Sequence, residues 1–323
     1  MRILFITANR LGDAVLSTGL LRALTELIPS VRFTIVCGPA AAGLFDAEAF
    51  PQLERLIVMR KLPWARHWWE LWKQVAATRW GMIIDLRGSG ISQLLLARRR
   101  RVFRGSANMQ HRVIDLARVL RVPDVPAPKL WIGEKHHAKA ATLWPQNEGP
   151  VLALGPTANW GGKMWPGERF AELALRLTAA DGILPNARIA VFGGPGEEAL
   201  AAPALAALPA DRTLNFIGKL GLLDIAASLQ RCVLYIGNDS GLMHLAAASG
   251  VPTVGLFGPS RELNYGPWGQ RTAAIRTDLS YHEILAQPGY DHRKQDSHML
   301  SLSVDKAQRG VERLWRYIQD DDQ

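Results

Sequence analysis

An acidic residue stands directly after the first strand-like run of the chain. Asp13 ends the sequence Arg10-Leu11-Gly12-Asp13, between an apolar run at 2–7 and a helical pattern at 14–28. Ligands of open parallel sheets bind at the carboxyl ends of the strands. An aspartate in that place can act as a general base toward a hydroxyl, or it can simply cap the helix that follows. The residues alone leave both roles open.

A turn rich in helix-capping residues follows a later apolar run at 232–236. It reads Asn238-Asp239-Ser240-Gly241-Leu242-Met243-His244 and opens a helical pattern at 241–248. Such a turn exposes backbone N–H groups at the positive end of a helix, which favours a phosphate or diphosphate. Ser240 and His244 are four residues apart and share one helix face, so His244 can donate to a phosphate or sugar oxygen. The alternative is a histidine that packs in the core or lies at the surface.

Two further strand ends carry groups suited to a phosphorylated ligand. The glycine-rich loop 155–166 contains Thr157 and Lys163, and this lysine can neutralise charge that develops on a leaving diphosphate. The turn 193–198 contains Glu197, whose carboxylate can accept hydrogen bonds from ribose hydroxyls or start a helix. A solvated lysine in a flexible loop is the alternative for Lys163.

Short strand-like runs alternate with longer helical patterns twice along the chain, which predicts an α/β fold with parallel sheets. The stretch 144–150 has the composition of a linker, so we expect domains at 1–148 and 149–303. The remaining residues, 304–323, form a last helix, for which one expected place is against the first domain. The strand-like runs are 2–7, 32–37, 54–59, 81–86, 151–154, 188–192, 214–217, 232–236 and 253–257, and the main helical patterns are 14–28, 167–179, 222–230 and 241–248.

The composition is that of a soluble chain with material for two packed cores. Of 323 residues, 48% are hydrophobic and 21% are charged, which excludes intrinsic disorder and a bundle of membrane helices. The net charge of +9 is unevenly divided: residues 1–148 hold 22 Lys and Arg against 11 Asp and Glu, and the rest hold 16 against 18. A basic first half favours an anionic partner such as a phosphorylated glycolipid, an anionic membrane face or nucleic acid. Solvated arginines without a partner would give the same balance.

Common cofactor and metal motifs are absent from the sequence. The first strand is followed by one glycine rather than by G-x-G-x-x-G, and Lys163 lacks the other residues of a P-loop. No H-E-x-x-H or paired C-x-x-C occurs, and His136-His137 has few neighbouring ligands, so we expect no metal and no bound cofactor. Cys37 and Cys232 stand far apart, which indicates reduced thiols and a cytoplasmic chain. We also expect no export signal and no transmembrane helix.

The basic half contains an arginine run and a set of tryptophans. The run Arg98–Arg101, with Arg104 close behind, would be stabilised by the dipole of a helix that it ends, so part of this signal is structural. Tryptophans at helical spacing are more typical of a packed face than of a binding stripe. An amphipathic helix with Trp and Arg can also lie on a membrane interface. The tryptophans are Trp64, Trp68, Trp69 and Trp72.

Taken together, four of these motifs resemble a known family, the bacterial lipopolysaccharide heptosyltransferases of glycosyltransferase family 9. The resemblance runs in order from residue 1 to about residue 270, and the element 239–248 is its most specific part. It implies a GT-B architecture, in which two Rossmann-like domains face each other across a cleft. The acceptor would bind mainly to the first domain and ADP-heptose mainly to the second. The motifs are Gly12-Asp13, Lys163-Met164-Trp165-Pro166, Asn238-Asp239-Ser240-Gly241-Leu242-Met243-His244-Leu245-Ala246-Ala247-Ala248 and Phe257-Gly258-Pro259-Ser260.

The resemblance also implies roles for individual residues. Asp13 would be the catalytic base that deprotonates the acceptor hydroxyl, and Lys163 would stabilise the departing ADP. Glu197 would contact the nucleoside, and Asp239 would bind sugar hydroxyls or backbone N–H groups rather than phosphate. The expected donor-binding residues are Thr157, Lys163, Glu197, Asp239, Ser240, Gly241 and His244, and the acceptor candidates are Arg10, Arg98, Arg101 and Arg104.

The leading hypothesis is an inverting, metal-independent glycosyltransferase that moves a heptose or a related sugar from an ADP-sugar to a lipopolysaccharide core or a similar anionic glycan. It would be cytoplasmic and peripheral on the inner membrane, with no nucleic acid as partner. One alternative is a GT-B transferase with another nucleotide sugar and acceptor, and another is a non-catalytic scaffold that binds a nucleotide sugar or glycolipid. Members of the family often carry cysteines after the last donor-domain strand, whereas 281–299 has none. That departure leaves the sugar and the acceptor open.

Overall fold

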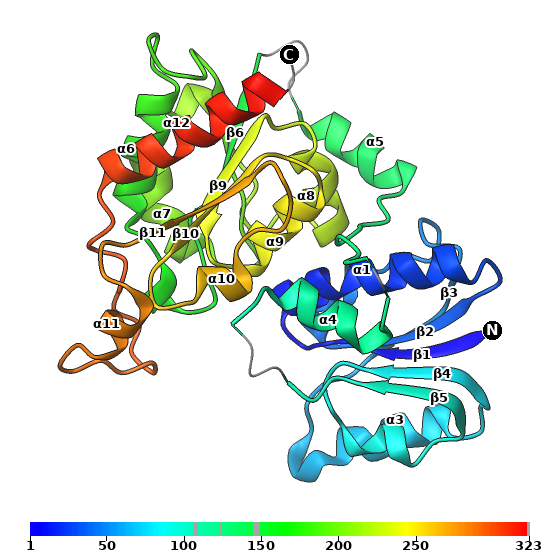
Figure 1. Cartoon of the computed structure of the whole chain (residues 1–323). Coiled ribbons are helices and arrows are strands. Elements are labelled where there is room, and N and C mark those ends of the chain that lie inside the picture. Colours follow the sequence, from blue (N-terminus) through cyan, green and yellow to red (C-terminus); the bar gives the residue numbers. More distant parts are fainter. Residues whose placement is uncertain (106–108, 123, 145–148, 322–323) are drawn as a thin grey trace. The chain divides into compact units, whose positions relative to one another are not determined.

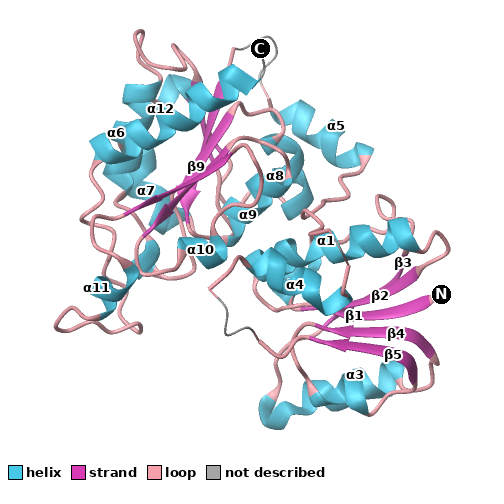
Figure 2. Ribbon diagram, in the orientation of Figure 1, coloured by secondary structure: helices cyan, strands magenta, loops and turns pink. Residues whose placement is uncertain are grey.

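The chain folds into two compact units, and the division between them falls between Glu134 and Lys135 in the sequence (Figure 1). The computed structural model describes residues 1–105, 109–122, 124–144 and 149–321. Each unit contains one parallel β-sheet with helices on both faces, which confirms the predicted α/β class (Figure 2). Parallel sheets require this double cover because their strands are apolar on both sides.

The first unit is a five-stranded sheet in the order β3-β2-β1-β4-β5. Helices α1 and α4 cover one face of the sheet and α3 covers the other (Figure 1). The strands are β1 (Arg2–Ile6), β2 (Arg32–Cys37), β3 (Leu53–Val58), β4 (Trp80–Asp85) and β5 (Ala97–Val102), and the helices are α1 (Leu11–Leu27), α2 (Pro39–Ala42), α3 (Arg66–Val75) and α4 (Arg112–Leu120). Short 3₁₀ turns lie at Pro63–Ala65 and Gly90–Gln93.

The second unit is a six-stranded sheet in the order β11-β10-β9-β6-β7-β8. Counted within the unit, this is the doubly wound order of a dinucleotide-binding fold. The strands are β6 (Val151–Gly155), β7 (Arg188–Val191), β8 (Thr213–Asn215), β9 (Leu234–Asn238), β10 (Thr253–Phe257) and β11 (Thr272–Arg276). The helices are α5 (Glu134–Leu143), α6 (Gly167–Leu177), α7 (Glu198–Ala206), α8 (Leu222–Leu229), α9 (Gly241–Ala248), α10 (Glu262–Tyr265), α11 (Tyr281–Leu285) and α12 (Val304–Asp321), with 3₁₀ turns at Gly161–Lys163 and Ala210–Arg212.

The core of each unit follows from its apolar central strands. Ile3, Leu4, Phe5 and Ile6 of β1 are wholly buried between β2 and β4. In the second unit, β9 has the same fully buried pattern between β6 and β10. Because all strands of a sheet are parallel, their carboxyl ends share one edge, and the loops at that edge carry most of the predicted functional residues.

Helix α5 falls in the second unit, so the division lies before the expected boundary at residue 148. His136 Nδ1 lies 2.6 Å from Asp224 Oδ1 on α8, and Lys139 Nζ donates to the other carboxylate oxygen. Burial raises the pKa of Asp224, but the bonds to His136 and Lys139 outweigh it and hold that pKa below its usual value. These bonds bring α5 to the second unit. Residues 145–148 of the predicted linker lie outside the described residues.

The last helix, α12, packs within the second unit. The apolar face of α12 belongs to the core of the second unit, beside α6 and β11 (Figure 1). Gly310 permits this packing, because a Cβ there would lie 2.3 Å from Ile275 Cδ1 of β11. Arg176 on α6 adds an ion pair with Asp305 at 2.6 Å. The helix therefore completes the second unit.

The arginine run lies on a strand and not at the end of a helix. Residues 98–101 are the middle of β5, the edge strand that pairs in parallel with β4. Edge strands tolerate charged residues because one side of their backbone is unpaired and solvated. The helical spacing of the tryptophans is confirmed for Trp68, Trp69 and Trp72, which lie on α3, but Trp64 precedes the helix and has a left-handed backbone. Within the described residues, no helix is long and apolar enough to span a bilayer.

Candidate functional site

The carboxyl edge of the second sheet gathers the predicted donor residues. Thr157 follows β6, Glu197 follows β7, and Asp239 and Ser240 follow β9. Strand β6 lies between β7 and β9, so these strand ends are neighbours. The strand order reverses between β6 and β9, which is where doubly wound sheets bind ligands.

Thr157 and Glu197 are joined by a hydrogen bond at this edge. Thr157 Oγ1 donates to Glu197 Oε2 at 2.6 Å, and the Gly194 N–H donates to the same oxygen at 2.8 Å. Glu197 immediately precedes α7 but makes no side-chain capping bond to that helix. Its carboxylate instead bonds to Thr157 after β6 and to the backbone of its own turn, while its carbonyl accepts from the Ala201 N–H of the helix.

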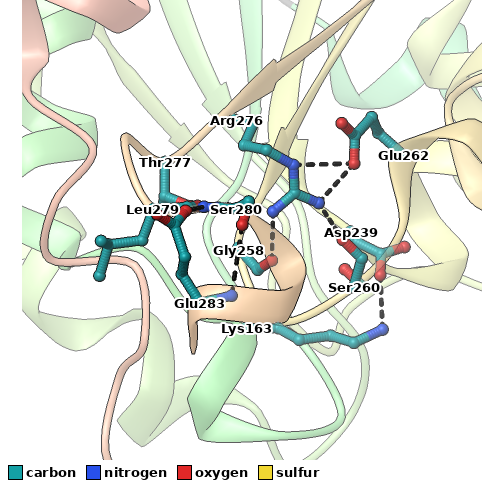
Figure 3. Close-up of polar contacts among 10 residues, drawn as sticks. All are labelled: Lys163, Asp239, Gly258, Ser260, Glu262, Arg276, Thr277, Leu279, Ser280 and Glu283. Carbon is teal, nitrogen blue, oxygen red and sulfur yellow. Dashed lines mark hydrogen bonds and ion pairs between the residues drawn. The ribbon is translucent and has the colours of Figure 1, made fainter. Parts of the chain in front are cut away.

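Lys163 forms an ion pair with Asp239 (Figure 3). The Nζ–Oδ2 distance is 2.5 Å, and the two side chains are 25% and 6% exposed. A carboxylate this far removed from water needs a cationic partner, and the lysine supplies it. The ammonium is thus held at the carboxyl end of β9, so the solvated-lysine alternative is wrong.

Asn238 holds both ends of the loop that carries Lys163. Its side-chain Nδ2 donates to the Pro156 carbonyl at 2.8 Å, and its Oδ1 accepts from the Trp165 N–H at 3.0 Å. Asn238 is wholly buried as the last residue of β9. The sequence marked this residue as a helix-capping type, whereas the structure uses it to join β9 to the two ends of the loop.

The turn after β9 leads into α9 as predicted. Ser240 is the N-cap residue, and its hydroxyl accepts from the Met243 N–H at 3.5 Å. Gly241 begins the helix, so the first N–H groups of α9 lie directly beside Asp239 and Ser240 in the chain. His244 is 4% exposed, which rules out the surface position among its alternatives.

Tyr235 is a residue of this edge that sequence reasoning missed. Its side chain is wholly buried, and its hydroxyl lies against Gly155 and Gly237, which are register partners on β6 and β9. A Cβ on Gly155 would lie 1.9 Å from the hydroxyl oxygen, and one on Gly237 would lie 2.2 Å from it. Burial raises the pKa of Tyr235, and the nearby Ser240 hydroxyl partly opposes this. Glycines paired near the ends of two adjacent strands were the available signal.

Arg276, the last residue of β11, organises the loop after β10 (Figure 3). Its guanidinium donates to the Gly258 carbonyl at 2.6 Å, to the Ser260 carbonyl, and to Glu262 Oε2 from Nε at 2.8 Å. The bond from Arg276 lowers the pKa of Glu262, against a smaller effect of burial. Sequence reasoning also missed this pair, although a charged residue closing an apolar strand was a visible signal.

Asp13 lies at the carboxyl edge of the first sheet. It is the third residue of α1, whose N-cap is Arg10, so Asp13 is not the capping residue. Arg112 Nε at the start of α4 approaches Asp13 Oδ1 to 3.6 Å, and both side chains are about one quarter exposed. The Arg112 guanidinium also lies over the Phe103 ring at 5.0 Å. Arg112 was not among the predicted residues, because nothing in its sequence neighbourhood points to Asp13.

The four acceptor candidates do not form one cluster. Arg10 is exposed just before α1, and Arg104 is exposed after β5, so both lie toward the carboxyl edge that carries Asp13. Arg98 is exposed near the start of β5, toward the opposite edge. Arg101 is half-buried, and its guanidinium donates to the Arg100 carbonyl at 3.3 Å. Among the described residues, no group of three or more His, Cys, Asp or Glu side chains is placed to hold a metal ion.

Comparison with known proteins connects these features to one family. The family model described as glycosyltransferase family 9 (heptosyltransferase) matches residues 76–288. Lipopolysaccharide heptosyltransferase 2 of Salmonella typhimurium is 31% identical over 171 residues, a match that covers 50% of this chain and 47% of that protein. The chain thus aligns with about half the length of this curated relative.

Solved structures of the same family have the same fold. A glycosyltransferase family 9 protein from Veillonella parvula superposes with a TM-score of 0.79 at 23% identity, over 97% of this chain and 96% of that one. The E. coli ADP-heptose lps heptosyltransferase II gives a TM-score of 0.77 at 19% identity, over 99% and 100%. These likenesses confirm the predicted GT-B class with its two Rossmann-like domains. Because the family model matches more than half of the chain, the chain belongs to glycosyltransferase family 9, the heptosyltransferases.

Proposed function

We propose that the protein transfers a heptose, or a closely related sugar, from an ADP-sugar to a lipopolysaccharide core or a similar anionic glycan. The observation that carries this proposal is the pair of polar contacts on neighbouring strand ends, Lys163 with Asp239 and Thr157 with Glu197. In the first pair, Lys163 offers a cation for a diphosphate. In the second pair, Glu197 offers a carboxylate for ribose hydroxyls. The names of the relatives supply the sugar and the acceptor class.

On the donor side, different residues at the carboxyl edge of the second sheet bind different parts of the donor. Lys163 and the N–H groups at the start of α9 neutralise the diphosphate, and Asp239 holds the lysine in place before the donor arrives. Glu197 accepts from the ribose, with Thr157 fixing its orientation. Ser240, Gly241 and His244 complete the diphosphate and sugar site. A divalent ion is not needed, because fixed positive groups already meet the charge of the leaving ADP.

On the acceptor side, Asp13 acts as the general base. It takes the proton of the acceptor hydroxyl while the oxygen bonds to the anomeric carbon of the sugar. The bond from that carbon to the diphosphate breaks in the same displacement, and ADP departs with the electron pair, so the configuration is inverted. Arg112, 3.6 Å away, keeps the carboxylate beside a cation before the acceptor binds.

A surface of the first unit fits contact with an anionic membrane. Residues 60–104 contain 11 Lys and Arg but only two acids, one of which, Asp85, is buried. Trp64 is 95% exposed, and both it and Ala65 have positive φ, a strained backbone that holds the indole in solvent. Four large apolar side chains of the first unit are exposed near these charges, and we call Trp64, Trp69, Leu94 and Leu96 the exposed apolar group. Indoles beside lysines and arginines are typical of proteins that rest on anionic lipid.

Vesicle sedimentation tests this membrane contact. The chain should sediment with vesicles that contain phosphatidylglycerol and stay in solution with neutral phosphatidylcholine vesicles. Replacing both exposed tryptophans by serine, Trp64→Ser and Trp69→Ser, should reduce the bound fraction while leaving ADP binding unchanged. Equal binding to both kinds of vesicle, or no effect of the double change, would rule out the exposed apolar group as the contact.

Calorimetric titration with ADP, UDP, GDP and CMP, without added metal, tests the donor assignment. Selective binding of ADP supports the proposal. Selective binding of UDP or GDP keeps the fold but assigns another donor, which is the first alternative. Binding of none of the four nucleotides would contradict a donor site built on Lys163 and Glu197 and would favour a scaffold.

A further inference from the structure

The segment 290–299, which follows α11, crosses the loop that carries Lys163. We call this segment the strap and the loop 157–164 the lysine loop. The sequence of the strap has no helical or strand pattern, and it contains none of the cysteines often found there in the family. Its contacts in the structure give it a definite place.

Four hydrogen bonds join the strap to the tip of the lysine loop. Two run from the loop to the strap: Trp160 Nε1 donates to the Lys294 carbonyl at 2.6 Å, and the Gly161 N–H donates to Gln295 Oε1 at 2.7 Å. Two run from the strap to the loop, because Ser297 Oγ donates to the Met164 carbonyl at 2.6 Å and the His298 N–H donates to the Gly162 carbonyl at 3.0 Å.

The His298 N–H thus bonds to the backbone of Gly162, one residue before Lys163, and the Ser297 hydroxyl bonds to the backbone of Met164, one residue after it. The backbone of the lysine is therefore held from both sides by the strap. A 3₁₀ turn at Gly161–Lys163 adds the bond from the Lys163 N–H to the Trp160 carbonyl at 3.1 Å.

Two glycines make this close approach possible. A Cβ on Gly161 would lie 2.2 Å from the Gln295 carbonyl oxygen, and one on Gly162 would lie 2.4 Å from the Trp160 ring. Any larger residue at these positions would push the loop away from the strap or from its own tryptophan. The glycines of this loop therefore serve contact with the strap, at the turn that presents Lys163.

The core fixes the ends of the lysine loop, and the strap fixes its tip. Asn238 bonds to Pro156 and Trp165, just outside the two ends of the loop. The strap is itself anchored at its last residue, Met299, which is wholly buried. A Cβ on Gly258 would lie 2.4 Å from the Met299 sulfur, so the anchor packs closely against the loop after β10. The tip of the lysine loop thus depends on a segment that follows it by more than 100 residues in the sequence.

We propose that the strap is a positioning element for Lys163, with Gln295 and Ser297 as positioning residues. They touch the lysine loop and not the donor, and they act by fixing the backbone from which the ammonium reaches the diphosphate. This inference rests on the proposed function, in which Lys163 meets the leaving ADP. Small displacements of a charged group from its working place are costly in rate, so loss of the strap bonds weakens donor binding and slows turnover.

The first test is amide hydrogen exchange of the ligand-free chain. In Gln295→Ala and Ser297→Ala, peptides that cover 157–164 should exchange faster than in the unchanged chain, because the tip has lost a bond to the strap. Arg293→Ala is the matched control, since the Arg293 side chain bonds to Asp291 within the strap itself. Exchange in 157–164 that is the same in all four chains would overturn the inference, whatever the protein binds.

The second test is the affinity for ADP, measured by calorimetry in the same variants. Gln295→Ala and Ser297→Ala should each bind ADP about threefold to tenfold more weakly, and Arg293→Ala should bind as the unchanged chain does. In the Lys163→Ala background the two strap changes should have no further effect, because the group that they position is gone. Equal losses with and without Lys163 would show a merely structural role and overturn the inference. Failure of the unchanged chain to bind ADP would instead contradict the proposed function, and hydrogen exchange would still decide whether the strap holds the loop.

Discussion

The carboxyl edges of the two sheets differ in how firmly their charged groups are held. At the second edge, Lys163 and Asp239 meet at 2.5 Å with the carboxylate almost wholly buried. At the first edge, Asp13 and Arg112 meet at 3.6 Å, and both side chains are about one quarter exposed. The two units share one fold class, so the fold does not set this difference. It comes from which residues stand at the strand ends and from what packs on the loops that carry them.

The contrast fits two different ligands. A diphosphate is small and highly charged, and a site for it gains from groups fixed in advance, as the strap and Asn238 fix the loop of Lys163. A large glycan acceptor needs an open edge and a base that is free to take a proton. Variants at the two edges test this division between a fixed donor edge and an open acceptor edge.

The largest effect is expected for Asp13→Asn. The amide cannot accept the acceptor proton, so turnover should fall by about 10²–10⁴-fold while the affinity for ADP stays nearly unchanged. Steady-state kinetics with calorimetry in parallel makes the measurement. If Asp13→Asn lost ADP binding to the same degree as turnover, Asp13 would have a structural role and the two edges would not divide between donor and acceptor.

A smaller loss is expected for Lys163→Ala at the fixed edge. The change removes a charged contact to the diphosphate, so the affinity for ADP should fall by about 10-fold to 100-fold. It also leaves Asp239 without its cation, so unfolding in urea must be followed in the same variant. Lys163→Ala together with Asp239→Asn is the control, because it removes the unpaired charge as well. ADP binding at full strength in both variants would exclude Lys163 from the donor site.

The packing beneath the fixed edge predicts a loss of stability in Gly155→Ala. The added methyl group would meet the Tyr235 hydroxyl at 1.9 Å, so the free energy of unfolding should fall by about 1–3 kcal/mol. Gly149→Ala is the matched control, because a Cβ there meets no atom of the described residues within 4 Å. Urea unfolding of the unchanged chain and the two variants measures the loss of stability. Equal stability of the two variants would show that Tyr235 moves aside with little loss of free energy.

The smallest expected effect is on how the stability of the chain depends on pH. The bond from Arg276 holds the pKa of Glu262 below its ordinary value of 4.5. A carboxylate whose pKa is lowered by folding adds stability above the unfolded-state pKa, and this contribution is lost as the pH falls through the folded-state value. The urea midpoint of the unchanged chain should therefore drop more between pH 6 and pH 3 than that of Glu262→Gln or Arg276→Met. Parallel curves for the three chains would show that the pair adds nothing to stability.

Much of the second unit could be predicted from sequence because its signals are local. The apolar runs at 151–154 and 232–236 predicted β6 and β9 to within two residues at each end, and the capping residues of 238–241 predicted the start of α9. The arginine run of β5 was misjudged, because charge obscures the strand pattern and only pairing with β4 makes it a strand. Tertiary contacts also decide the place of α12. Its apolar spacing predicts a helix but does not predict which sheet the helix covers.

The partners of the site residues lay beyond sequence reasoning. Thr157 and Glu197 are 40 residues apart, and Lys163 and Asp239 are 76 apart, so only the sheet order brings them together. Arg112 and the strap were missed for the same reason, since neither has a local pattern that points to the residue it contacts. Residue types at strand ends thus predict the chemistry of a site, while the contacts that fix it depend on tertiary packing.

A direct transfer assay tests whether the chain moves a heptose from an ADP-sugar to the glycan acceptor. The purified chain would be mixed with ADP-heptose and a lipid A precursor of the inner core in the presence of a metal chelator, and both ADP release and the mass of the acceptor would be followed. We expect ADP release matched by an acceptor that gains one heptose, and loss of both in Asp13→Asn. An unchanged acceptor under conditions in which the chain binds ADP would contradict this expectation.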